Sequence, residues 1–138
     1  MASLQTQTTS FKAECWQAVH NLLTDQIKMA LYTSAANLNQ STTVYTTSGE
    51  ITSPGYEVGG AVMTGATIGT ADFTVFADWA DVVFPVPLTA RYALIYNASK
   101  GNKSVAVLDF GTDKTSLTAF SVALPPNTAS TALLRSSN

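Results

Sequence analysis

Short runs of alternating apolar and polar residues, separated by turn-forming residues, recur along most of this chain. The clearest pair is residues 90–96 (ARYALIY) and 103–110 (KSVAVLDF), joined by six mostly polar residues that include a glycine. Two such runs with a short connection favour antiparallel pairing. Turn signals follow at roughly the 8–12-residue spacing of sandwiches and barrels. We therefore predict a mostly-β chain, either an antiparallel β-sandwich or a jelly-roll-like barrel.

Other segments fit this reading. Residues 27–33 (IKMALYT) alternate and predict a half-buried strand. Residues 56–68 predict a strand interrupted by Gly59 and Gly60, where a bulge or a close backbone approach is expected. Pro85 and Pro87 favour a sheet edge for the apolar run before them. Shorter strands are predicted at 72–76, 117–124 and 132–134.

The N-terminal part differs from the rest. Apolar residues at helical spacing predict one short helix over 11–23, capped by Ser10. The polar residues 1–10 are expected to form a flexible N-terminal arm or an early edge strand. Residues 11–138 are expected to form a single β-rich domain, because nothing in them is typical of a linker.

The composition limits the partners. Only 12% of the residues are charged, the formal net charge is −2, and Ser and Thr supply much of the polar surface. A surface with so little charge tends to associate, which fits either a secreted or oligomeric β protein with a Thr-rich exterior or a subunit covered by neighbours in an assembly. The seven Lys and Arg residues are scattered, so no nucleic-acid partner is expected. No secretory signal is evident, and no apolar run approaches the roughly 20 residues that span a membrane, so no membrane partner is expected.

No pattern in the sequence points to catalysis. His20 lies five residues after Cys15, so the two side chains diverge on a helix. The lone cysteine also excludes an internal disulfide and a cysteine-based zinc cluster. No phosphate loop or nucleophile elbow is present. We expect no enzyme activity, no cofactor and no metal.

Three aromatic residues are the candidates for contact with a partner. Tyr45, Tyr56 and Phe84 lie in segments that look irregular or carry flanking glycine or proline. Aromatic side chains are enriched at the energetic centres of protein interfaces. We therefore predict that these three residues belong to a contact surface.

The order of several sequence blocks resembles a family of small tailed-bacteriophage virion proteins. Lys28–Thr33 (KMALYT) corresponds to its K-x-A-L-Y-T strand, and Gly55–Gly60 (GYEVGG) to its G-Y-x-x-G-G step. Thr89–Tyr96 (TARYALIY) and Leu108–Lys114 (LDFGTDK) resemble its largest conserved block. The resemblance covers most of residues 11–124.

This resemblance implies a structural protein of the virion, made in the cytoplasm of the host bacterium. The form we expect is a capsid cement or decoration protein, which binds the major capsid protein and itself, as a homodimer or homotrimer. Two alternatives remain open at this point: a tail, connector or fibre component, and a carbohydrate-binding β-sandwich with exposed aromatics. A small hydrolase has no supporting residues.

Overall fold

The structure is a computed structural model that describes residues 4–137, and its largest element is a five-stranded antiparallel sheet. The strand order is β1 (Leu4–Gln7), β8 (Lys103–Ser116), β7 (Leu88–Asn97), β2 (Ile27–Tyr32) and β3 (Ala61–Val62). All four pairings in this sheet are antiparallel. We call it the main sheet.

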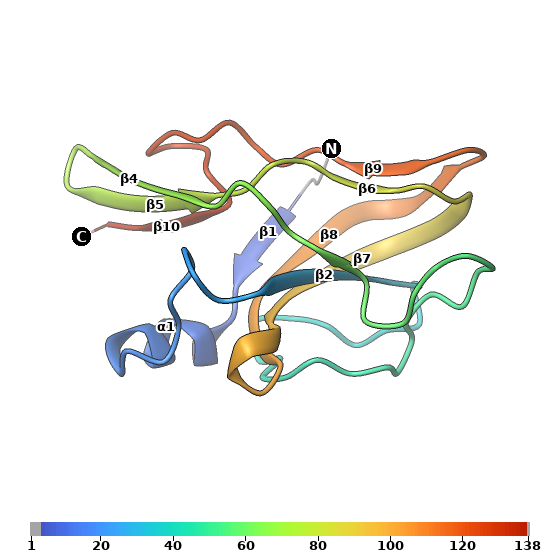
Figure 1. Cartoon of the computed structure of the whole chain (residues 1–138), viewed down its shortest axis with the longest axis horizontal. Coiled ribbons are helices and arrows are strands. Elements are labelled where there is room, and N and C mark those ends of the chain that lie inside the picture. Colours follow the sequence, from blue (N-terminus) through green and yellow to red (C-terminus); the bar gives the residue numbers. More distant parts are fainter. Residues whose placement is uncertain (1–3, 138) are drawn as a thin grey trace.

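Two smaller antiparallel sheets lie together over one side of the main sheet (Figure 1). One has the order β10 (Leu134–Ser136), β5 (Thr74–Asp78) and β4 (Thr67–Ala71). The other pairs β6 (Val82–Phe84) with β9 (Phe120–Val122). The prediction of a mostly-β chain with one short helix is confirmed.

The principal core lies between these two layers. It combines inward residues of the main sheet with residues of the smaller sheets; among its buried members are Met29, Leu31, Ile95, Leu108, Trp79, Phe84, Phe120 and Val122. A second cluster lies on the opposite face of the main sheet and includes Ala30, Tyr32, Leu94 and Val107. Strand β2 is therefore buried on both faces, and the prediction that it is half-buried is wrong. The irregular segment 33–60 supplies the cover, through Leu38 and Tyr45.

The hairpin predicted from residues 90–110 is confirmed. Strands β7 and β8 pair antiparallel from Leu88↔Ser116 to Asn97↔Lys103, with two register irregularities. A single 3₁₀ turn, η1 (Ala98–Lys100), makes the connection, followed by Gly101 in the left-handed conformation. The Ser99 N–H donates to the Asn97 side-chain oxygen at 3.0 Å, which closes the turn.

The close backbone approach predicted at Gly59 and Gly60 is confirmed for Gly60. Gly60 has a φ of +81°, and a Cβ placed on it would lie 1.9 Å from the carbonyl oxygen of Met29. No other residue fits at that distance, because nonbonded carbon and oxygen atoms do not approach so closely. This contact holds the end of segment 33–60 against β2.

The helix is shorter than predicted. Helix α1 spans Thr9–Trp16, and its N-cap is Thr8 rather than Ser10, with the Thr8 Oγ1 accepting from the Phe11 N–H at 3.3 Å. Only Phe11 among its residues is buried. The chain leaves the helix at Gln17 and reverses at Ala18, whose φ is +60°. The apolar residues after Ala18 keep the spacing of a helix in the sequence, but they are not part of α1.

Of the two predictions for residues 1–10, the early edge strand is confirmed and the flexible arm is wrong for the part that the structure describes. Residues Leu4–Gln7 form the edge strand β1, with Gln7 paired to Ala106. Thr8 is fully buried, and its hydroxyl lies 2.9 Å from that of Ser104. Residues 1–3 lie outside the described residues.

Candidate interaction surface

The three aromatic residues predicted to contact a partner make contacts inside the protein instead. Phe84 is only 5% exposed and stacks on Tyr56, with ring centroids 5.9 Å apart. Tyr45 stacks on Tyr96 at 4.7 Å. Tyr56 and Phe84 also border a cavity of about 310 Å³. The contacts that the structure shows for these residues are internal. Their contact with a partner stays a prediction.

A buried carboxylate explains why the two tyrosines lie where they do. Glu50 is 7% exposed and accepts hydrogen bonds from the Tyr45 and Tyr56 hydroxyls, at 2.6 and 2.8 Å, and from the Gly59 N–H at 2.8 Å. Burial raises the pKa of both tyrosines above the ordinary value, and the nearby Glu50 raises it further. Both hydroxyls therefore remain donors. The arrangement fastens segment 33–60 and leaves no reactive group free.

His20 is likewise held in a structural network. Its side chain is fully buried, with Nε2 2.8 Å from Glu14 Oε1 and Nδ1 2.9 Å from the amide nitrogen of Asn97. The Asn97 amide is oriented by the Ser99 N–H, so its nitrogen faces the ring and the ring proton belongs on Nε2. Both ring nitrogens are thus occupied, and neither is available to activate Cys15. Within residues 4–137 no group of His, Cys, Asp or Glu side chains is arranged to hold a metal ion.

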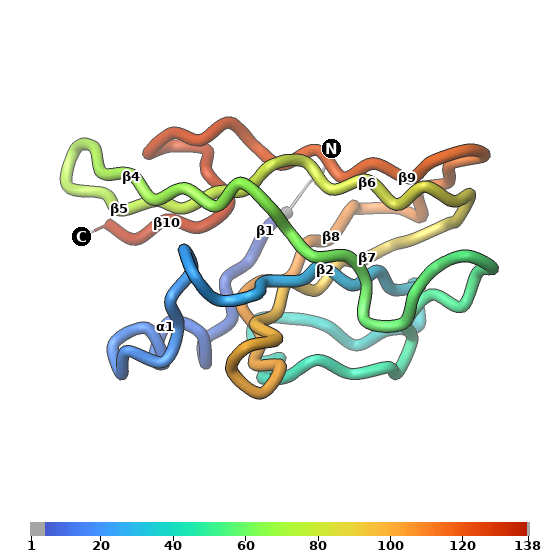
Figure 2. Tube along the Cα trace, in the orientation of Figure 1, coloured from blue at the N-terminus to red at the C-terminus, as the bar shows by residue number. Residues whose placement is uncertain are grey.

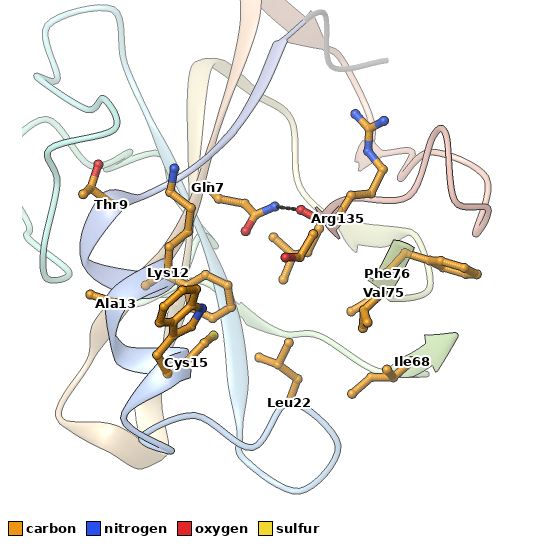
Figure 3. A pocket seen from close by; sticks show the side chains of 15 residues that line it. Gln7, Thr9, Lys12, Ala13, Cys15, Leu22, Ile68, Val75, Phe76 and Arg135 are labelled. Atoms are coloured by element: carbon orange, nitrogen blue, oxygen red, sulfur yellow. Dashed lines mark hydrogen bonds between the residues drawn. The ribbon is translucent and has the colours of Figure 1, made fainter. Parts of the chain in front are cut away.

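The surface that stands out is an apolar groove between α1 and the three-stranded sheet (Figure 3). Helix α1 forms one wall, and strands β4, β5 and β10 form the other. The groove has a volume of about 650 Å³. Most of its lining side chains are apolar, namely Phe11, Ala13, Trp16, Leu22, Ile68, Val75, Phe76, Ala77 and Leu134. Figure 3 shows Cys15 and Leu22 on the helix side, across from Ile68 and Val75.

Helix α1 is short and packs on the core through one residue, Phe11, so its other side chains remain available to line the groove. Phe11 fills the core beneath the groove and lies 5.0 Å from the His20 ring. The opposite end of the helix carries Trp16, which is 94% exposed. An indole of that size is seldom left in water, since covering it is worth roughly 1.5–3 kcal/mol on the scale for large apolar side chains.

The charged residues of the groove all carry the same sign. Lys12 comes from α1 and Arg135 from β10, and among the described residues no Asp or Glu lines the cavity. The two side chains extend toward the same side of the groove in Figure 3. The Gln7 amide donates to the Arg135 carbonyl oxygen at 2.7 Å and joins β1 to β10 below them. An occupant with an apolar side chain and a neighbouring carboxylate would match this lining.

A second exposed aromatic lies at the tip of the β4–β5 hairpin, whose strands contribute to the groove. Ala71 pairs with Thr74, so Asp72 and Phe73 form a two-residue turn. Both have positive φ, +52° and +64°, which is typical of the type I′ turns that usually contain glycine or asparagine. Phe73 is 97% exposed. A ring held in water on a strained backbone is a common mark of a binding residue.

Sequence reasoning missed both of these residues. Trp16 falls within the helix predicted over 11–23, and Phe73 within the strand predicted over 72–76. One signal was present: Asp72-Phe73 is a two-residue spacer between two short runs, which is the length of a tight hairpin. Because such turns usually have glycine at the second position, Phe73 at that position does not indicate a turn.

Comparison with known proteins adds no assignment: no protein-family model, no curated protein and no solved structure matches this chain. Among the residues described, the helices are all too short or too polar to cross a lipid bilayer.

Proposed function

We propose that this protein is a structural component of a tailed-bacteriophage virion, and specifically a cement or decoration protein that binds the shell of major capsid protein. It would be synthesised in the cytoplasm of the host bacterium. The observation that carries the proposal is the apolar groove lined by the exposed Trp16, together with the exposed Phe73 at the tip of the β4–β5 hairpin. Exposed apolar surface of this kind is typical of proteins that are covered by others in an assembly.

The composition supports the same conclusion. With 12% charged residues, the surface gives little protection against association, and its polar part is mainly hydroxyl. The groove also falls within the 300–1,000 Å³ of ordinary binding pockets, so one or two side chains of a neighbour would fill it. The buried polar clusters around Glu50 and His20 serve packing, as described above.

The resemblance to small virion proteins supports the choice of assembly. Two of its blocks, KMALYT and TARYALIY, correspond to β2 and β7 with their immediate neighbours, the central strands of the main sheet. The third, GYEVGG, contains the glycine that approaches Met29. The shared residues thus fall on the framework of the fold, and the groove lies outside them.

Purified particles provide the test. Quantitative mass spectrometry and electron microscopy of intact virions should find the protein in many copies on the head, and heads made without it should release their DNA at lower temperature. Low copy number at a single vertex would favour a tail or connector component and overturn the cement assignment. Absence from particles would overturn the whole proposal.

An add-back experiment tests the surface itself. Purified protein should saturate heads that lack it, and Trp16→Ser should bind them at least tenfold more weakly, as expected for loss of an aromatic anchor. Leu117→Ser is the matched control, because Leu117 is 86% exposed and does not line the groove. Equal binding by both variants would exclude the groove from the contact with the head.

A further inference from the structure

The hairpin tip and the groove have complementary chemistry on the same molecule. The tip presents the Phe73 ring with the Asp72 carboxylate beside it. The groove presents apolar walls, and Lys12 and Arg135 are the charged residues within 4–137 that line it. The tip does not fold back into the groove of its own chain, because the two strands of the same hairpin form one wall of that groove through Ile68 and Val75.

We propose that the groove receives the Asp72-Phe73 tip of a second copy of this chain. Phe73 would enter between α1 and the three-stranded sheet, and Asp72 would lie near Lys12 and Arg135 at the rim. This inference rests on the proposed function, since it names an occupant of the same surface. It also gives a reason for the strained turn, because a loop that only faces solvent gains nothing from holding two non-glycine residues at positive φ.

The position of the tip favours a reciprocal exchange. The tip and one wall of the groove belong to one hairpin, so a tip that enters a neighbour's groove brings the neighbour's hairpin alongside its own. The neighbour's tip then faces the first copy's groove. Such an arrangement uses the same patch on both copies, which is the property of a two-fold dimer. Figure 2 shows that this hairpin projects at one end of the molecule, away from the main sheet.

The area involved indicates how stable this dimer would be. A buried aromatic side chain contributes roughly 150–250 Å². Two tips and a matching area of groove wall therefore bury roughly 600–1,000 Å², below the area of about 1,200 Å² at which stable specific complexes begin and within the range of weak ones. We expect a dimer that is populated at about 100 µM and dissociates near 1 µM.

Sedimentation of the purified full-length protein, without heads, tests the proposal. Wild-type protein should show a monomer–dimer equilibrium, and Phe73→Ser should weaken it at least tenfold. Leu117→Ser removes an equally exposed apolar side chain elsewhere and should leave the equilibrium unchanged. Circular dichroism melting of each variant establishes that it is folded.

Charge reversal gives an independent measurement. Asp72→Lys and Lys12→Asp should each weaken dimerisation, and the double variant should recover part of the loss, because the two charges then attract again. The reversal Asp113→Lys is the control, since Asp113 is an exposed acidic residue that does not line the groove.

The outcomes separate this inference from the proposed function. A monomer at 500 µM, a trimer, or Phe73→Ser with unchanged affinity would each overturn the exchange of tips. Heads that still bind a monomeric Phe73→Ser variant in full would leave the cement assignment standing on its own. A normal dimer that is absent from virions would support the exchange and overturn the cement assignment.

Discussion

Replacing Phe73 by glycine should make the protein more stable, although it removes a large apolar side chain. The ring is 97% exposed, so its deletion gives up almost no burial. Its φ of +64° lies in the left-handed region, where a side chain costs about 1–2 kcal/mol. Glycine adopts this conformation freely but loses about 0.5–1 kcal/mol through its greater freedom in the unfolded chain.

The balance of these two effects is a gain of about 0.5–1 kcal/mol in the free energy of unfolding. For a chain of this length that corresponds to an increase of about 2–4 °C in the melting temperature. Thermal and urea unfolding followed by circular dichroism measure it directly, at a protein concentration low enough to keep the chain monomeric.

Gly101→Ala is the matched control for the backbone contribution. Gly101 has a φ of +66°, close to that of Phe73, and a Cβ placed there meets no atom within 4 Å. It should therefore lose about 1 kcal/mol from backbone strain alone. If Gly101→Ala behaves in this way and Phe73→Gly nevertheless lowers the melting temperature, the ring stabilises the monomer and our reasoning about the tip is refuted.

Three further substitutions test the interior. Glu50→Ala should lower the free energy of unfolding by about 3 kcal/mol, since three donors lose their acceptor, and a loss under about 1 kcal/mol in urea titration would contradict the network described here. Burial raises the pKa of the Asp78 carboxyl, so the folded state binds the proton more tightly than the unfolded state does. The stability that this proton binding contributes is lost as pH rises from about 4, the unfolded-state pKa, through the folded-state pKa. Asp78→Asn should accordingly gain stability relative to wild type between pH 4 and 7, and a constant difference across that range would argue against a raised pKa. Thr8→Ala removes the N-cap of α1 and should cost about 1–2 kcal/mol, measured by the same titration, whereas Ser10→Ala should cost less.

The parts of the fold that were predictable from sequence are those governed by local pattern. The β7–β8 hairpin follows from two apolar runs and a short polar connection, and the connection lies where the sequence places it. Gly60 was recognisable because glycine inside a strand pattern indicates close backbone contact. In both cases the information lies within a few residues of the feature.

Features that depend on distant residues were not predictable. The alternation in β2 predicts one solvent-exposed face, but residues 33–60 cover that face. The sequence periodicity of β2 carries no information about these contacts. The helix ends at Trp16 although apolar residues continue at helical spacing, because Ala18 reverses the chain and His20 is drawn into the network with Glu14 and Asn97. Tertiary contacts override local preference at these positions.

The candidate surface illustrates the same limit. Aromatic residues in irregular segments were reasonable choices for contact, yet Tyr45 and Tyr56 are held by Glu50, which no local rule connects to them. The groove instead combines one helix with strands at both ends of the chain. Only the three-dimensional arrangement brings Trp16 of α1 and Ile68 of β4 to one cavity.

The pairing of β1 with β8 has a consequence for how the chain is made. Gln7 reaches its partner Ala106, and its side chain bonds the carbonyl of Arg135, only after all the chain between these residues has left the ribosome. Closing so long a loop is slow, because non-local strand pairs form late. Strand β1 is therefore synthesised well before it can dock, and until then the edge of β8 remains open to a neighbouring nascent chain.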